Sequence, residues 1–299
     1  MRKIRGRAGG VLKSSEADAV RSELRALANP AKARILSGFF KTGRGEYGEG
    51  DRFLGVVMPQ LRKVVKAHWR APEGEIVRLL RSEYHEERMA ALLMLVEQYR
   101  RGDESRKKAI YELYLANTAW INNWDLVDLT APYIIGAQLA GTDSTVRRGI
   151  RPSATQQTCP DPPPQQKSGE KCELRKLARS ESLWERRIAM LATYHFIRQG
   201  DGRAALETAG LLLHDPHDLI HKAVGWMLRE VGKRCSMEQE CGFLDTHAAV
   251  MPRTMLRYAI ERFPDSLKLK YLRMGKNRSQ KSGVRSQKPK TNDIPSSDS

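Results

Sequence analysis

A pattern of two helices joined by a short polar turn occurs at least twice in the chain. Residues 87–115, ERMAALLMLVEQYRRGDESRKKAIYELYL, and residues 185–213, ERRIAMLATYHFIRQGDGRAALETAGLLL, share one plan. Each begins with Glu-Arg, runs through an Ala-rich helix to a Gly-Asp turn, and then enters a second helix; residues 218–249 repeat this more loosely. A spacing of roughly 35 to 45 residues per helix pair is typical of HEAT-like solenoids. The sequence therefore predicts an all-α, HEAT-like helical-pair solenoid with a concave face.

Helical periodicity fills almost all of residues 16–272, and no run with a period of two residues is long enough to predict a sheet. Turn-forming residues separate several of the helices, as at Asn29-Pro30, Gly200-Asp201-Gly202 and Pro216. The expected helices span residues 16–28, 30–40, 58–69, 74–84, 85–101, 172–180, 182–199, 203–214, 217–235 and 252–263.

Three stretches lack this periodicity and set the expected domain bounds. Residues 141–171 are rich in Pro, Ser, Gln and Gly, and we expect them to form a disordered insertion. Residues 1–15 are expected to be a disordered basic N-terminus, and residues 273–299 a disordered tail. Residues 16–272 are then one repeat domain that the insertion interrupts.

The formal net charge of +17 over 299 residues indicates a polyanionic partner. Such a partner is most often nucleic acid and less often an acidic membrane surface, although basic tails account for part of the charge. No apolar run approaches the roughly 18 to 20 residues that span a bilayer, and the basic N-terminus lacks the apolar segment of a secretory signal. The four cysteines form no CxxC pair. We therefore expect a cytoplasmic, nucleoid-associated protein of the bacterial type with reduced thiols, a basic concave face and no membrane partner.

The stretch INNWDLVDLTAPYIIG, residues 121–136, places a carboxylate inside an apolar helical stripe. Asp125, about 60° from Asp128 on the helix, is expected to cap or to pair structurally. Burying an unpaired carboxylate is costly, so either a partner satisfies Asp128 or the stripe faces something that needs a negative charge. At about 100° per residue, the stripe consists of Trp124, Val127, Asp128, Ala131 and Ile135.

The stretch HDLIHKAVGWMLREVGK, residues 217–233, predicts a helix with two different faces. The expected buried stripe consists of Ile220, Val224, Met227, Leu228 and Val231. The opposite face carries Lys222, Trp226, Arg229 and Lys233. Lysine stems that shield an incidental tryptophan would explain this face. The alternative is a face that grips phosphates, with an aromatic platform between its cations.

A third candidate segment, SLWERRIAMLATYHFIR, places Trp184, Ile188 and Leu191 on one helix face, with Arg187 at its border. Arg186 points elsewhere. Taken alone, this arrangement is typical of repeat-core packing with an arginine at the edge.

The chemistry available to Asp128 is limited by what the sequence places around it. No His or Cys lies at metal-ligand spacing from Asp128, and no Ser or Cys is evidently paired with a histidine, so we expect no metal and no cofactor. A desolvated carboxylate can stabilise developing positive charge or orient a water molecule. Cleavage of an N-glycosidic bond passes through an oxocarbenium-like state that needs such a carboxylate. An alkylated purine that is already cationic leaves without a general acid.

Together these segments resemble the DNA alkylation repair family of HEAT-repeat DNA glycosylases, the AlkD-like proteins. The matching stretches are GEYGEGDRFLGVVMPQLRKV, NNWDLVDLTAPYIIG, LWERRIAML and LIHKAVGWMLREVGK, within roughly residues 20–272 and outside the insertion. The resemblance implies excision of cationic alkylated purines, such as 3-methyladenine and 7-methylguanine, from double-stranded DNA. It also implies that no metal takes part and that the lesion is not buried in a base-specific pocket.

Carried over by motif position, the resemblance implies a role for each candidate residue. Asp128 would be the catalytic carboxylate, and Trp124 and Trp226 would pack against the deoxyribose of the lesion. Arg187 and Arg229 would hold the DNA backbone. Further DNA contacts would come from Lys222, Lys233 and Tyr47.

Two other classes of function compete with a monomeric glycosylase. A HEAT-like scaffold that binds DNA or protein without catalysis would share the fold, because fold alone does not determine function. An RNA-binding solenoid would repeat base-reading side-chain pairs in every unit, and the sequence has no such code. The combination of Asp128 with two tryptophans favours the enzyme.

Overall fold

The structure is a computed structural model that describes residues 15–142 and 168–281. Its first half contains α1 (Glu16–Ala26), α2 (Pro30–Phe39), α3 (Met58–His68), α4 (Glu73–Leu80), α5 (His85–Arg101), α6 (Glu104–Ala116), η1 (Thr118–Trp120), α7 (Trp124–Asp128), η2 (Pro132–Gly136) and α8 (Ala137–Thr142). Its second half contains α9 (Ser168–Ala178), α10 (Leu183–Ala192), α11 (Tyr194–Arg198), α12 (Arg203–Leu211), α13 (Asp218–Arg234), α14 (Met237–His247), α15 (Arg253–Ala259), η4 (Ile260–Arg262) and α16 (Asp265–Lys281).

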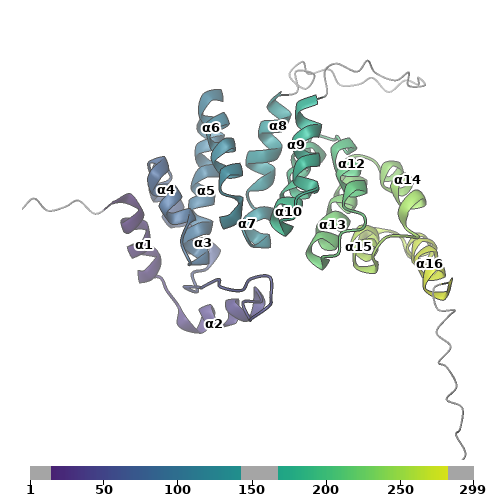
Figure 1. Cartoon of the computed structure of the whole chain (residues 1–299), viewed down its shortest axis with the longest axis horizontal. Helices are drawn as coiled ribbons and strands as arrows, with labels where there is room; N and C mark the ends of the chain where they lie inside the picture. The colour runs from purple at the N-terminus through teal and green to yellow at the C-terminus, as the bar shows by residue number, and fades with distance from the viewer. Residues whose placement is uncertain (1–14, 143–167, 282–299) are drawn as a thin grey trace, which may run out of the picture.

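The helices form a bent row in which neighbours in sequence are neighbours in space (Figure 1). One layer consists of α3, α5, α7, α10, α13 and α15, each packed against the next. The other layer consists of α4, α6, α8, α9, α12 and α14. Within the described residues the only strand-like pairing is an isolated bridge between Arg52 and Tyr84. The prediction of an all-α helical-repeat solenoid is confirmed.

The core follows the predicted helical stripes. All five residues expected on the inner face of α13, from Ile220 to Val231, are fully buried. Gly225 lies on the same helix where a Cβ atom would come within 2.4 Å of the Met255 carbonyl oxygen, so its lack of a side chain lets α13 and α15 approach closely. In the first half of the row, α5 is buried along most of its length between α3, α4 and α6.

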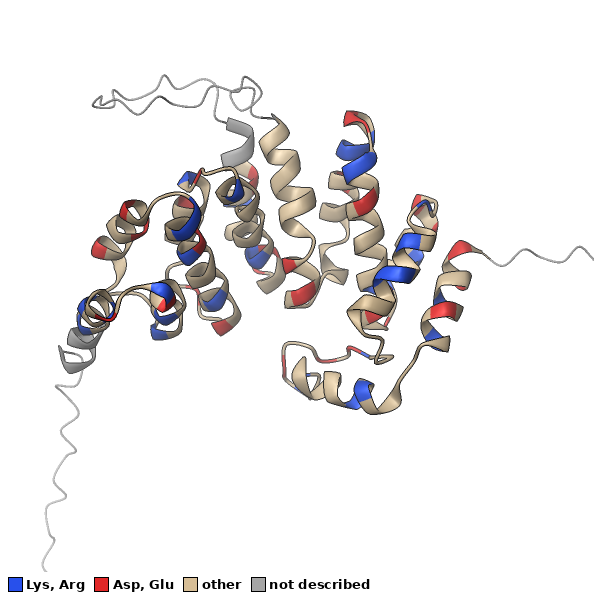
Figure 2. Ribbon diagram, turned by 180° about the vertical axis from the view of Figure 1, so that it is seen from behind, with Lys and Arg blue, Asp and Glu red and all other residues tan. Residues whose placement is uncertain are grey.

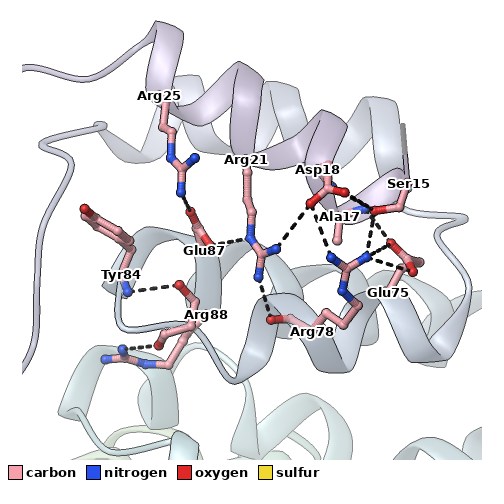
Figure 3. Close-up of polar contacts among 11 residues, drawn as sticks. Ser15, Ala17, Asp18, Arg21, Arg25, Glu75, Arg78, Tyr84, Glu87 and Arg88 are labelled. Atoms are coloured by element: carbon pink, nitrogen blue, oxygen red, sulfur yellow. Dashed lines mark hydrogen bonds and ion pairs between the residues drawn. The ribbon is translucent and has the colours of Figure 1, made fainter. Parts of the chain in front are cut away.

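Charged side chains attach α1 to the row (Figure 3). The buried carboxylate of Glu87 on α5 forms ion pairs with Arg21 at 3.0 Å and with Arg25 at 3.7 Å. Arg78 on α4 bonds both the hydroxyl of Ser15, which caps α1, and the carboxylate of Asp18. These contacts join the first helix to α4 and α5 before the chain continues to α2.

Two predicted helices are interrupted. The expected helix over residues 182–199 is divided at Thr193, whose hydroxyl donates to the Met190 carbonyl and so competes with the backbone ladder. The stretch 121–136 is also not one helix, because α7 ends at Asp128 and a π-helical turn begins at Pro132, which has no N–H to donate. Val127, Ala131 and Ile135 are nevertheless fully buried, as the stripe predicted.

The expected bounds of the irregular stretches differ from the ends of the helices. Gly141 and Thr142 belong to α8, and residues 168–171 to α9, whereas the sequence predicts that these residues belong to the insertion. Similarly, α16 continues to Lys281, past the expected start of the tail at 273, and it does so through Gly275 and Asn277. The remaining residues expected to be disordered, 1–14, 143–167 and 282–299, lie outside the described residues.

Lys and Arg are interspersed with Asp and Glu over the described helices (Figure 2). On the layer containing α6, for example, Arg106, Lys107 and Lys108 all pair with glutamates. A concave basic face therefore stays a prediction. No helix in residues 15–142 or 168–281 is long and apolar enough to cross a membrane.

Candidate functional site

Asp128 at the end of α7 is paired with Arg187 of α10. Nε and Nη2 of Arg187 each lie 2.8 Å from one oxygen of the Asp128 carboxylate, and Nη1 donates to the Leu219 carbonyl at the start of α13. The Arg187 side chain is 5% exposed and that of Asp128 is 12% exposed. Burial raises the pKa of the Asp128 carboxyl, and the positive charge of Arg187 opposes that rise. Because both oxygens accept from the guanidinium, the pair is held in its ionised form.

This pairing explains why an apolar stripe carries a carboxylate. It also places Arg187 differently from the sequence interpretation. Arg187 lies inside the packed layer rather than at its edge, since it joins α7, α10 and α13. Arg186 does point elsewhere, toward Asp215 at 2.6 Å. The signal for the pair was present in the sequence only as two separate irregularities, a carboxylate and an arginine on apolar faces 59 residues apart.

The start of α7 is fixed by a buried polar network. Asn123 caps the helix by accepting from the Trp124 N–H, and it donates to Asp51 at 3.1 Å. Asp125 lies 2.9 Å from Nε2 of His85, the first residue of α5. The structural role expected for Asp125 is confirmed. Sequence reasoning missed His85, because nothing local in the sequence brings Asp51, His85 and Asp125 together.

Trp124 belongs to a stack of aromatic rings. Its ring is stacked on Phe40 at a centroid distance of 5.2 Å and contacts the edge of Phe39 at 5.9 Å. Phe40 is in turn stacked on Phe53 at 5.1 Å. Phe39 and Phe40 lie at the end of α2, so the chain between α2 and α3 folds back against α7. We call Phe39, Phe40, Phe53 and Trp124 the aromatic wall.

Tyr47, from the same connection between α2 and α3, lies beside the aromatic wall. Its ring contacts the edge of Trp184 on α10 at 6.1 Å. Burial raises the pKa of Tyr47, whereas hydrogen bonding with the Trp124 side chain and the nearby charge of Lys222 lower it. Candidate residues from three distant parts of the chain are thus brought together. Trp184, which the sequence favoured as core packing, is half-buried and belongs to this cluster.

The outer face of α13 is only partly available for a ligand. Lys222 pairs with Asp218 at 2.7 Å, and Arg229 pairs with Glu261. Lys233 is exposed and forms no ion pair within the described residues. The predicted face is therefore real, but carboxylates of the protein already neutralise two of its three cations.

Trp226 on that face is half-buried, and its aromatic neighbour is Tyr194 at 6.3 Å. Within the described residues, no hydrogen bond, ion pair or ring contact joins Trp226 to Asp128, Arg187 or the aromatic wall. Asp128 is paired with Arg187 and lies one turn after Trp124 on α7, whereas Tyr47 lies near Trp124, Trp184 and Lys222. Trp226 follows Lys222 by one turn on α13 and has Tyr194 as its aromatic neighbour.

The described residues contain no group of three or more His, Cys, Asp or Glu side chains arranged to hold a metal ion. Cys172, Cys235 and Cys241 are free thiols.

Fold and site together define a helical-repeat protein with a buried carboxylate–guanidinium pair behind aromatic side chains. The family model of the DNA alkylation repair enzymes matches residues 20–150 and 164–263, so the chain belongs to that family. Among solved structures, it is similar to a protein described as a predicted DNA alkylation repair enzyme from Enterococcus faecalis. That similarity has a TM-score of 0.55 at 15% identity and covers 80% of this chain and 97% of the other. No curated protein matches.

Proposed function

We propose that the protein is a DNA glycosylase that excises positively charged N3- or N7-alkylated purines from double-stranded DNA. The observation that carries this proposal is the Asp128–Arg187 pair, a desolvated carboxylate held in its ionised form. Family membership supports a role in alkylation repair. The reaction and its substrate class are inferred from the chemistry of the site.

In this reaction the bond between C1′ of deoxyribose and the purine nitrogen breaks, and the bonding electrons leave with the base. Because an N3- or N7-alkylated purine is already cationic, it departs as a neutral molecule without prior protonation. The sugar becomes oxocarbenium-like, and a water molecule adds to C1′ and loses a proton. Asp128 would stabilise the sugar cation and orient that water.

The rings near Asp128 would supply the remaining contacts to the lesion. Trp124, supported by Phe40 from behind, offers a flat face to a cationic sugar or base, and such a contact contributes about 0.5 to 2 kcal/mol. Tyr47 and Lys222 lie on the same side. Trp226 would contact the deoxyribose from α13, where it follows Lys222 by one turn.

Arg187 is better suited to orienting Asp128 than to gripping DNA alone. A guanidinium has five N–H groups, of which three are used on Asp128 and Leu219. The remaining two belong to a side chain that is only 5% exposed, so a direct phosphate contact would need the surrounding helices to move apart. The proposed backbone contacts of Arg229 and Lys222 would require exchanging Glu261 and Asp218 for phosphates.

Unpaired cations on the N-terminal side support a DNA-binding face. Lys32, Arg34, Lys41 and Arg44 are exposed, and none forms an ion pair within the described residues. They lie on α2 and the chain that follows it, which also supplies Phe39, Phe40 and Phe53 of the aromatic wall. Such cations retain their full attraction for phosphates.

The test is single-turnover release of the base from double-stranded DNA carrying 7-methylguanine, comparing wild type with Asp128→Asn. We expect the substitution to lower the rate by about 100-fold to 1000-fold, as removal of one transition-state contact does, while DNA binding persists. The matched control is Asp215→Asn, which removes the carboxylate paired with the neighbouring Arg186. Full activity of Asp128→Asn, or equal losses in both variants, would contradict the assignment.

One observation favours a second function, a scaffold that binds DNA without catalysis. Arg187 already neutralises Asp128, and a fully satisfied pair is also what a purely structural contact looks like. Tight DNA binding by the wild type with no base release, from 7-methylguanine or 3-methyladenine substrates, would establish that alternative.

A further inference from the structure

A buried histidine lies directly behind the aromatic wall. Nε2 of His85 is 2.9 Å from Asp125, and Nδ1 is 3.4 Å from Asp51. Ionised carboxylates accept hydrogen bonds but do not donate them, so both ring nitrogens must carry a proton to satisfy both partners. The geometry therefore favours the imidazolium form of His85, whose side chain is only 4% exposed.

Charged groups facing His85 come from the loop before α3, from α5 and from α7. Asp51 also accepts a hydrogen bond from Nη2 of Arg88 at 2.6 Å. With His85 as a cation, the two carboxylates of Asp51 and Asp125 balance the two positive charges of His85 and Arg88. The imidazole is stacked on Phe53 at 4.7 Å and tilted against Phe40 at 5.0 Å. Aromatic faces of this kind stabilise a desolvated cation.

His85 is connected to the proposed catalytic groups in two ways. Phe40, which covers the imidazole, also supports Trp124. Asp125, which binds the imidazole, lies on α7 with Asp128, and its negative charge raises the pKa of Asp128. A cation on His85 offsets that charge, and it also fastens α7 to the loop that carries the wall.

We propose that the His85 imidazolium is a positioning residue for base release, because it holds Trp124 in the aromatic wall and neutralises Asp125 beside Asp128. This proposal rests on the glycosylase function proposed above. His85 touches neither the lesion nor the reacting atoms, and it acts through Phe40 and Asp125.

The proposal predicts loss of activity at alkaline pH. Burial alone lowers the pKa of His85, but the charge and hydrogen bond of Asp125, together with Asp51, outweigh it and raise the pKa to about 9. The imidazolium is therefore present at neutral pH and is lost as the pH rises through that value. Base release should then decline above that pH and level off at the slower rate of the uncharged site.

The experiment compares His85→Gln with a matched control, His68→Gln. His68 is also held by two carboxylates, Glu16 at 2.8 Å and Glu23 at 2.9 Å, but it lies on α3 against α1, away from the site. Single-turnover release of 7-methylguanine is measured from about pH 6 to about pH 10, with a blank lacking protein subtracted. Glutamine keeps polar contacts but cannot carry the charge.

We expect His85→Gln to release the base at least about tenfold more slowly at neutral pH and to show no alkaline decline. His68→Gln should keep the wild-type rate and pH profile. A second variant, Asp125→Asn, retains the histidine but lowers its pKa, so the alkaline decline should move to lower pH. A wild-type profile in His85→Gln, or the same changes in His68→Gln, would overturn the proposal.

Failure of the proposed function remains distinguishable from failure of this inference. If the wild type releases no base, the glycosylase assignment fails. The position of Trp124 in the aromatic wall is then tested by measuring tryptophan fluorescence as a function of pH. The Trp124 signal is the difference between the fluorescence of the wild type and that of Trp124→Phe. A transition near pH 9 that His85→Gln abolishes supports the positioning role, and a flat signal overturns it.

Discussion

At the residue scale, the Asp128–Arg187 pair sets the protonation state on which the proposed chemistry depends. Arg187 is the group that opposes the effect of burial on Asp128. A carboxyl group with a raised pKa loses its charge at a higher pH than an ordinary aspartate does as the solution is acidified. Activity that needs the carboxylate is therefore lost on the acid side, at a pH that Arg187 controls.

Replacing Arg187 by Gln should move the acid limb of base release to higher pH and lower the rate at neutral pH. Burial of Asp128 would then be unopposed, so its pKa would rise further. The measurement is the single-turnover rate between about pH 5 and about pH 8. Arg186→Gln, which alters the neighbouring Arg186–Asp215 pair, is the control. An unchanged acid limb in Arg187→Gln would show that the pair does not tune Asp128.

Glu240 on α14 provides a prediction about stability. Glu240 is 1% exposed, and one oxygen of its carboxyl group has no hydrogen-bond partner within the described residues. Burial, opposed by the charge of Arg229, raises its pKa to about 8. The folded protein keeps this proton after the unfolded chain has lost its own, so the group lowers stability progressively as the pH rises from about 4.5 to about 8.

Glu240→Gln should therefore raise the melting temperature, and by more at about pH 8 than at about pH 5. Each pH unit of that interval corresponds to at most about 1.4 kcal/mol. The exposed Glu112→Gln on α6 should show no such dependence, since its side chain is 62% exposed. Equal shifts in Glu240→Gln at both pH values would contradict the assigned protonation.

At the element scale, two glycines let helices approach more closely than any other residue would allow. A Cβ atom on Gly136 would lie 2.2 Å from the Ala192 carbonyl oxygen, where the π-helical turn meets the end of α10. The corresponding distance at Gly225 is 2.4 Å, where α13 meets α15. Both contacts are with backbone atoms, which do not move aside as a flexible side chain does.

Gly225→Ala and Gly136→Ala should each destabilise the fold by about 1 to 3 kcal/mol, the usual cost of overpacking. Gly210→Ala and Gly242→Ala are matched controls, because both positions are helical and have open space around the added methyl group. These should be neutral or stabilising by up to about 1 kcal/mol. The midpoint of urea unfolding measures the stability of all four variants. A Gly225→Ala variant as stable as the wild type would refute the close approach of α13 and α15.

Sequence periodicity predicted the helices well where each one buries a stripe. The inner face of α13 is an example, and the solenoid follows from repetition of such pairs. Breaks such as those at Thr193 and Pro132 are set by local hydrogen bonding that periodicity does not register. For the site, the sequence identified Asp128 and Arg187 separately. It could not identify their pairing, the His85 network or the place of Trp124 in the aromatic wall, because these depend on contacts between residues more than 30 positions apart.

At the scale of the whole molecule, the proposed DNA contacts depend on which cations remain unpaired. Lys32→Gln with Arg34→Gln on α2 should weaken binding to undamaged double-stranded DNA and reduce the dependence of affinity on salt. The slope of log affinity against log salt should fall by about 0.9 for each phosphate that the protein no longer neutralises. The control is Lys107→Gln with Lys108→Gln on α6, where both lysines already pair with glutamates. Identical slopes for the two double variants would remove α2 from the DNA-binding face.

The Asp128–Arg187 pair also crosses the longest stretch between described helices, the interval from Thr142 to Ser168. The carboxylate comes from one side of that interval and the guanidinium from the other, and the same two halves meet where Gly136 contacts Ala192 and where Thr118 bonds Glu185 at 2.7 Å. The halves are thus held by their own interface as well as by the peptide chain. A protein severed within this interval should stay assembled, and two separately produced fragments should reconstitute one site by complementation.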